Sequence, residues 1–304
     1  MFLIVLTEFV RIKGVIYWSA ISFIGFILGI SSLNLSTYMV PLLVFLSSTF
    51  FVMSFTFAIN NYYDIESDIK NPRRIKVNAI ASGKISKKIS LSLIIMFAII
   101  PLIISILYKL EIFFFCAFLL FEGWAYSAFP LRIKSRPVLD ILWHILGFFS
   151  YVMWGSFIAG SITLLNWLMA ISLGVWSSVA QIGNHICDYS FDKDSGTMTF
   201  AVWVGLDKAR ITMNFLTFIH LIILIPLVLS YSLKYWVTIS LVIIIPILGF
   251  IILKPEKGAI PIKSFTYYFT VVIGGAVYLS CIVYKIMLVI GAPPIDFYTL
   301  LSIA

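Results

Sequence analysis

The sequence predicts an all-α integral membrane protein with nine transmembrane helices bundled around a central cavity. Of its 304 residues, 62% are hydrophobic and only 11% are charged, and the mean hydropathy is +1.08. Soluble domains carry about 25% charged residues. Nine apolar segments also approach the roughly 20 residues that a helix needs to cross a bilayer. These predicted spans cover residues 15–33, 38–60, 88–108, 110–129, 141–163, 165–187, 208–232, 235–253 and 264–288.

The basic residues gather on one side of this predicted bundle. All of the 21 lysines and arginines except Lys109, Lys234 and Lys285 lie before span one or in connections that follow even-numbered spans. By the positive-inside rule, the N-terminus and these connections are cytoplasmic, and the C-terminus, after nine spans, is outside. We therefore expect a multi-pass protein of the cell membrane, and the net charge of +8 needs no nucleic-acid partner.

The first two spans differ in polarity. Span one follows Arg11 and Lys13, which we interpret as membrane anchors, with contact to a phosphate as the alternative. Span two carries Thr49, Ser54 and Thr56 in its second half, so we expect that half to face the bundle interior.

An acidic motif follows span two directly. If the helix continues, Asn60, Asp64 and Asp68 recur every four residues and share one face, which presents only oxygen ligands. Carboxylates spaced in this way repel each other unless a cation lies between them. The alternative is that these acids are simply solvated at a helix end.

Basic residues follow this motif on a loop. Pro72 makes continuation of the helix past residue 71 unfavourable, so Arg73, Arg74 and Lys76 are expected on a loop beside the acids. Such a cluster fits two roles equally well. It either anchors the protein to anionic lipid or contacts a diphosphate, which arginine can bind with two donors.

Spans three to five carry few charged residues. Only residues 109–111 join spans three and four, which indicates antiparallel neighbours. Glu122 in span four is expected to face the interior because a charged group in lipid is costly. Tyr126 and Lys134 follow near the membrane face that carries the acids. We interpret Asp140 as the N-cap of span five and His144 as a hydrogen-bonded interior histidine.

Span six ends in a second copy of the acidic motif. Asn184, Asp188 and Asp192 repeat the spacing of the first motif, and Lys193 and Asp194 follow. Two matched oxygen faces favour cation binding over chance. Mg²⁺ prefers oxygen ligands and is commonly held by one or two carboxylates together with substrate phosphates. The sequence therefore predicts a phosphate or diphosphate substrate that Mg²⁺ bridges to the protein.

The two motifs also suggest an internal repeat. Each follows a pair of spans, so a pseudo-repeat of four helices, spans one to four and five to eight with a ninth helix added, is a reasonable interpretation. We treat residues 1–304 as a single transmembrane domain.

These residues resemble the UbiA superfamily of intramembrane prenyltransferases. That family carries an NxxxDxxxD motif after span two, a DxxxD motif after span six and a tyrosine-containing basic element after span four. The corresponding residues here are Asn60, Asp64 and Asp68, then Asp188 and Asp192 with Gly196, and the run Tyr126-Ser-Ala-Phe-Pro-Leu-Arg-Ile-Lys134. Two positions depart from the pattern. Asn61 stands where many members have Asp, and Asn78-Ala79 stands where many have Arg-Pro.

The resemblance implies ionisation of an allylic diphosphate, with Mg²⁺ neutralising the leaving group and aromatic side chains stabilising the carbocation. The implied metal ligands are Asn60, Asp64, Asp68, Asp188 and Asp192. The four acids are also the implied catalytic residues, together with Tyr126, for which a packing role is equally open. The candidates for diphosphate contact are Arg73, Arg74, Lys76, Lys134, Lys193, Asn60 and Asn184.

Substrates and competing functions remain to be weighed. The expected partners are a prenyl diphosphate, a lipophilic acceptor and the bilayer, with no obligatory protein partner. We favour geranylgeranylglyceryl phosphate as acceptor, with aromatic, quinone or carotenoid acceptors as alternatives. A cation-coupled transporter is the alternative from another class, but transporter sites lie near the midplane on broken helices, whereas these acids end their spans.

Overall fold

The computed structural model describes residues 4–70, 74–252 and 265–294, and within these every regular element is helical. Short π-helical or 3-10 segments cover Val5–Phe9, Ile133–Ser135 and Val228–Ser232. The α-helices are α2 (Ile12–Gly29), α3 (Leu35–Tyr63), α4 (Ile65–Ile69), α5 (Lys87–Tyr108), α6 (Leu110–Ser127), α7 (Pro137–Ala159), α8 (Leu164–Cys187), α9 (Tyr189–Asp194), α10 (Phe200–Val204), α11 (Leu206–Leu227), α12 (Trp236–Ile252) and α13 (Phe265–Val289).

The predicted all-α membrane fold is confirmed. Eight helices among the described residues are long and apolar enough to cross a bilayer, and α12 supplies a shorter apolar stretch, Val237–Gly249. Each predicted span corresponds to one helix, with ends that differ by a few residues. The apolar composition predicts helices because a segment in the bilayer core must satisfy its own backbone hydrogen bonds. An α-helix does so within a single segment.

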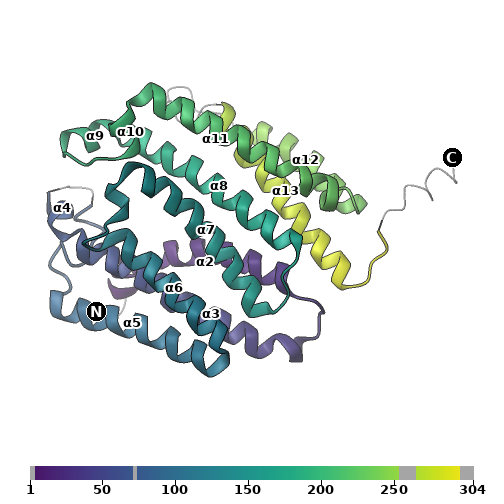
Figure 1. Cartoon of the computed structure of the whole chain (residues 1–304), viewed down its shortest axis with the longest axis horizontal. Helices are drawn as coiled ribbons and strands as arrows, with labels where there is room; N and C mark the ends of the chain where they lie inside the picture. The colour runs from purple at the N-terminus through teal and green to yellow at the C-terminus, as the bar shows by residue number, and fades with distance from the viewer. Residues whose placement is uncertain (1–3, 71–73, 253–264, 295–304) are drawn as a thin grey trace.

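The helices pack side by side along one common direction (Figure 1). Helix α7 lies at the centre and contacts α2, α3, α6 and α8. On one side, α3, α5 and α6 pack against one another; on the other side, α11 packs against α8 and α13, and α12 covers α13. Contacts between α13 and α2 join the two sides, so the helices surround an interior rather than forming a flat layer.

Helices α2 and α7 approach each other so closely that only glycine fits at two positions. A Cβ atom on Gly25 would lie 1.8 Å from the main-chain oxygen of Val152, and one on Gly155 would lie 2.0 Å from that of Ser22. Small residues at such a crossing let backbones touch, as is typical of membrane helices. By contrast, a Cβ atom added to Gly147, which also lies on α7, would have no neighbouring atom within 4 Å.

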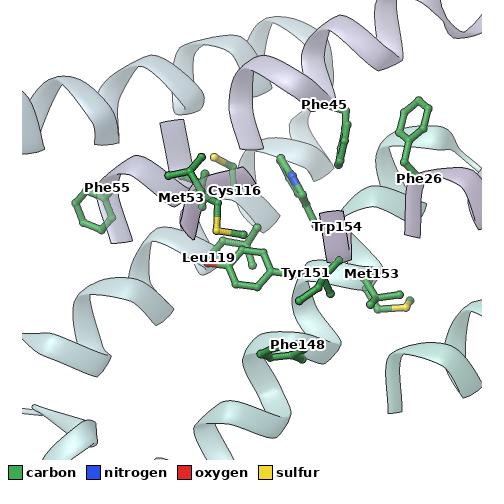
Figure 2. Packing of buried hydrophobic residues seen from close by; sticks show 14 of the residues in the cluster. Phe26, Phe45, Met53, Phe55, Cys116, Leu119, Phe148, Tyr151, Met153 and Trp154 are labelled. Carbon is green, nitrogen blue, oxygen red and sulfur yellow. The ribbon is translucent and has the colours of Figure 1, made fainter. Parts of the chain in front are cut away.

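The core beside this crossing contains many aromatic and sulfur-containing side chains, which come from α2, α3, α6 and α7 (Figure 2). Trp154 is completely buried there, and its Nε1 donates to Thr49 Oγ1 at 2.9 Å. The polar second half of span two therefore faces the interior, as predicted.

Candidate active site

Both acidic motifs lie where a long helix gives way to a short one. Asp64 separates α3 from α4 with φ −96° and ψ 5°, and Asp188 separates α8 from α9 with φ −89° and ψ 6°. The two helix breaks thus have almost the same backbone geometry. Figure 1 shows α4 and α9 at the same end of the bundle. The two motifs share this local structure, but each long helix ends before the first aspartate instead of continuing through the motif. The wider four-helix repeat stays a prediction.

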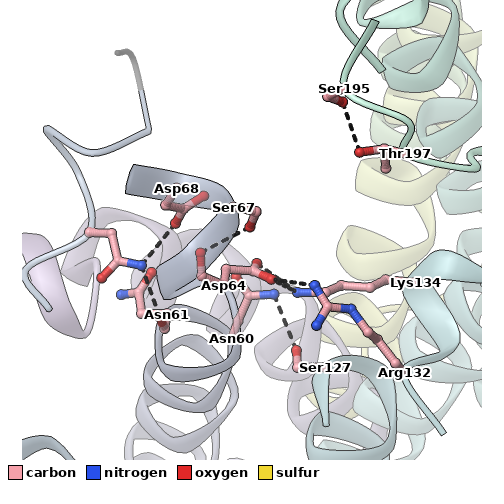
Figure 3. Close-up of polar contacts among 11 residues, drawn as sticks. Asn60, Asn61, Asp64, Ser67, Asp68, Ser127, Arg132, Lys134, Ser195 and Thr197 are labelled. Atoms are coloured by element: carbon pink, nitrogen blue, oxygen red, sulfur yellow. Dashed lines mark hydrogen bonds and ion pairs between the residues drawn. The ribbon is translucent and has the colours of Figure 1, made fainter. Parts of the chain in front are cut away.

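Asp64 points towards the basic element that follows α6 (Figure 3). Both of its carboxylate oxygens accept from Lys134 Nζ at 2.6 Å, and Arg132 Nη2 lies 3.3 Å from Oδ1. The Asn60 amide lies 3.2 Å from Ser127 Oγ. With its amide reversed, Asn60 also accepts from Lys134 Nζ at 3.1 Å and donates to Asp64 Oδ2 at 3.3 Å. The start of the motif is therefore fixed to the end of α6.

Asp68, by contrast, is almost completely buried, with 4% of its surface exposed. Its Oδ2 accepts from Asn78 Nδ2 at 2.8 Å, and the same amide group donates to the Asn61 main-chain oxygen at 2.8 Å. Burial raises the pKa of Asp68 and the Asn78 hydrogen bond opposes this rise. Sequence reasoning missed Asn78, although its departure from the family pattern was the available signal.

Asn61 binds the N-terminal segment to the site. Its Nδ2 donates to the main-chain oxygens of Phe9 at 2.7 Å and Glu8 at 3.2 Å, and its Oδ1 accepts from Arg11 Nη2. Arg11 adopts a left-handed conformation, with φ 56°, at the start of α2. Its side chain lines the internal cavity described below, so the interpretation of Arg11 as a membrane anchor is wrong.

The second motif is more open than the first. Asp188 is exposed and Asp192 is half-buried, and burial followed by repulsion from Asp188 raises the pKa of Asp192. The charge of Arg74 lowers the pKa of both Asp68 and Asp192, against the effect of burial.

The remaining predicted ligands are less engaged. Asn184, Lys76 and Lys193 are exposed, and the Lys193 ammonium lies 5.9 Å from the ring centre of Tyr189. Arg73 lies outside the described residues, as do the predicted cytoplasmic bases Lys254, Lys257 and Lys263.

The two motifs offer carboxylate and amide oxygens, which are the type of ligand that a hard cation prefers. Among residues 4–70, 74–252 and 265–294, no three histidine, cysteine, aspartate or glutamate side chains gather into a metal cluster. The acids form two pairs instead, and in each pair burial disfavours the charge of one member. A cation would relieve that penalty. Pairs of carboxylates match Mg²⁺ sites that substrate phosphates complete.

A cavity of about 210 Å³ extends from this end into the bundle. Its polar wall includes Arg11, Asn60, Glu122, Tyr126, His144 and Gln181. Aromatic side chains, among them Trp18, Phe57, Phe148 and Tyr151, form much of the rest. The predicted central cavity is thus present, with Asn60 belonging both to it and to the first acidic motif.

Tyr126 belongs to a polar network beside the cavity. Its hydroxyl lies 3.4 Å from His144 Nε2, so His144 is hydrogen-bonded in the interior as predicted. Asp140 is 1% exposed, and its Oδ2 lies 3.1 Å from His185 Nε2 and accepts from Gln181 Nε2 at 3.0 Å. The N-cap of α7 is Arg136. The interpretation of Asp140 as an N-cap is therefore wrong, because the carboxylate points sideways to α8.

Solved structures of known proteins share this architecture. A UbiA homologue from Archaeoglobus fulgidus, solved with GPP and Mg²⁺, superimposes with a TM-score of 0.70 at 21% identity, covering 94% of this chain and 99% of that one. A structure described in a study of digeranylgeranylglyceryl phosphate synthase in membranes also gives a TM-score of 0.70, at 21% identity and over 93% of this chain and 98% of that one.

Sequence comparison finds relatives of two kinds. The digeranylgeranylglyceryl phosphate synthase of Methanobrevibacter smithii is 26% identical over 231 residues, which are 72% of this chain and 78% of that protein. The lycopene elongase/hydratase of Corynebacterium glutamicum is 30% identical over 176 residues, 54% of this chain and 58% of that protein. The UbiA prenyltransferase family model matches residues 19–273, and the chain belongs to this family.

Proposed function

We propose that this intramembrane prenyltransferase is Mg²⁺-dependent and transfers a polyprenyl group to a lipid acceptor, geranylgeranylglyceryl phosphate. The observation that carries the proposal is the arrangement of the two acidic motifs at one end of the bundle (Figure 1), with Lys134 on Asp64, beside an aromatic cavity that Asn60 also lines. The similarity to two digeranylgeranylglyceryl phosphate synthases supports the acceptor.

In this proposal the acidic motifs bind the metal ion and the basic residues bind the diphosphate. Asn60, Asp64, Asp68, Asp188 and Asp192 would hold Mg²⁺, which supplies neutralising charge for the departing diphosphate. Lys134 would contact phosphate oxygens directly, because its ammonium lies against Asp64, and Arg74 is a second candidate because its charge acts on both Asp68 and Asp192. Asn184, Lys76 and Lys193 remain candidates for the same role on the outer side.

The cavity shields the reacting end of the prenyl group. Trp18, Phe57 and Phe148 line it, and aromatic ring faces can stabilise positive charge. Tyr126, one helical turn from Glu122, contributes a further ring between these aromatic walls and the first acidic motif. Enclosure by these aromatic side chains would keep water from the allylic cation until the acceptor arrives.

A carotenoid acceptor is the second candidate, since the two Corynebacterium glutamicum elongases reach 30% and 29% identity over 176 residues. A transporter is disfavoured because the acids sit at one end of the bundle, beyond α3 and α8. On the positive-inside rule we further infer that this end, with the N-terminus, is cytoplasmic and that the C-terminus is outside.

The test uses purified protein in nanodiscs with geranylgeranyl diphosphate and a panel of glycerol phosphate, aromatic, quinone and carotenoid acceptors. We expect prenylated product and diphosphate only with Mg²⁺, and loss of both in Asp64→Ala and Asp188→Ala. Asp207→Ala is the matched control, because Asp207 is an exposed acid at the start of α11. Turnover without Mg²⁺, or full activity in both motif variants, would contradict the proposal.

A further inference from the structure

Glu122 lies in the cavity wall, deeper than the acidic motifs. It precedes Ser127, the α6 residue that contacts Asn60, by five positions, which is about 7.5 Å along a helix. Only 3% of its surface is exposed, and it lines the cavity beside Tyr126 and Trp143. The carboxyl group therefore sits below the diphosphate end of the cavity, at the depth where the first carbons of a prenyl chain would lie.

One oxygen of this carboxyl group has a partner and the other does not. Oε1 accepts from Ser150 Oγ at 3.2 Å, and the main-chain oxygen accepts from Trp143 Nε1 at 3.1 Å. Oε2 is buried and contacts no hydrogen-bonding group of the described residues. A buried polar atom without a partner is costly, and an acid inside a membrane bundle marks a functional site.

The neighbouring hydroxyl groups are engaged elsewhere. Thr56 Oγ1 donates to the Val52 main-chain oxygen at 3.0 Å, and Tyr151 interacts with Thr56 through its side chain. Ser150 Oγ is shared between Glu122 Oε1 and the Leu146 main-chain oxygen. These groups have partners and Glu122 lines the cavity, so a molecule bound in the cavity is the candidate partner for Oε2.

We propose that Glu122 binds the hydroxyl group of the prenyl acceptor and so selects a lipid alcohol over a hydrocarbon polyene. This inference rests on the proposed function and names the chemical class of the acceptor. A hydroxyl gives Oε2 its missing hydrogen bond and lies beside the prenyl carbon that it must reach. A polyene has no hydroxyl group to donate, so Oε2 of Glu122 would remain buried without a hydrogen-bond partner.

The test compares Glu122→Leu and Glu122→Gln with the wild type, using geranylgeranylglyceryl phosphate as the hydroxyl acceptor and lycopene as the polyene. We expect Glu122→Leu to raise the KM for the hydroxyl acceptor at least about tenfold, equivalent to about 1.4 kcal/mol. The KM for geranylgeranyl diphosphate should stay the same. Glu122→Gln, which keeps a hydrogen-bonding oxygen, should restore most of the affinity.

Glu111→Leu is the matched control, because Glu111 is an exposed acid on the same helix, and it should leave both KM values unchanged. An unchanged acceptor KM in Glu122→Leu, or equal increases in both KM values, would overturn the role of Glu122. If the wild type prenylates lycopene and not the alcohol, and Glu122→Leu leaves that reaction intact, the inference also fails. Absence of any turnover in the wild type would instead overturn the proposed function.

Discussion

Single residues decide which charges meet at this site, and the Lys134 contact with Asp64 is the clearest case. The sequence offered five bases near the acids and no means of ranking them. In the structure, Lys134 contacts both oxygens of Asp64, whereas Lys76 is exposed. Burial lowers the pKa of Lys134 and the Asp64 carboxylate opposes this, so the two charges depend on each other.

We expect Lys134→Met to raise the KM for the prenyl diphosphate by about 10- to 100-fold, because a hydrogen bond to a charged group contributes roughly 1.5–3 kcal/mol. Steady-state kinetics at saturating Mg²⁺ measure this. Lys208→Met, at an exposed position on α11, is the control and should behave as the wild type. An unchanged KM in Lys134→Met would show that other bases hold the diphosphate.

The contacts of three residues were not predicted from the sequence, and the reason is the same for each. Asn78, Asp140 and His185 act through partners on other segments, namely Asp68 for the first and each other for the last two. Spacing along one helix predicts which side chains share its face. It carries no information about which side chain of another helix lies opposite, so these contacts required the structure.

At the scale of elements, hydropathy predicted the helices, but the motif spacing was read on a continuing helix and did not predict the breaks at Asp64 and Asp188. The α2 and α7 crossing was predictable only in part. Gly155 allows the close packing of α2 and α7, whereas Gly147 lines the cavity. Both are glycines of one helix eight residues apart, so composition alone does not separate the two roles.

We expect Gly155→Ala to destabilise the protein by about 1–3 kcal/mol, because overpacking forces backbones apart. The added methyl group would meet the Ser22 main-chain oxygen at 2.0 Å and the Phe26 nitrogen at 2.5 Å. Thermal unfolding in nanodiscs measures the effect. Gly275→Ala is the control, since no such neighbour lies within 4 Å of its Cβ, and helix propensity favours alanine. Equal melting temperatures for both variants would refute this account of the crossing.

At the scale of the whole molecule, the orientation in the membrane can be tested with native residues. Cys187 is exposed at the end of α8, next to Asp188, whereas Cys116 and Cys281 are buried. A membrane-impermeant maleimide should therefore label Cys187 in inside-out vesicles and not in sealed right-side-out vesicles. Cys187→Ser should abolish the labelling. The opposite pattern would place the active-site end outside the cell.

The ion pair between Lys134 and Asp64 has a consequence for how the site fills. A cation that takes over the Asp64 oxygens must displace the Lys134 ammonium, which lies 2.6 Å from each of them. The displaced ammonium is then free to neutralise an anion at the same place. Cation and anion affinity are thus thermodynamically linked, and by reciprocity each ligand should strengthen the binding of the other by the same factor. Lys134 would thus neutralise Asp64 in the empty site and the bound anion once the cation has taken its place.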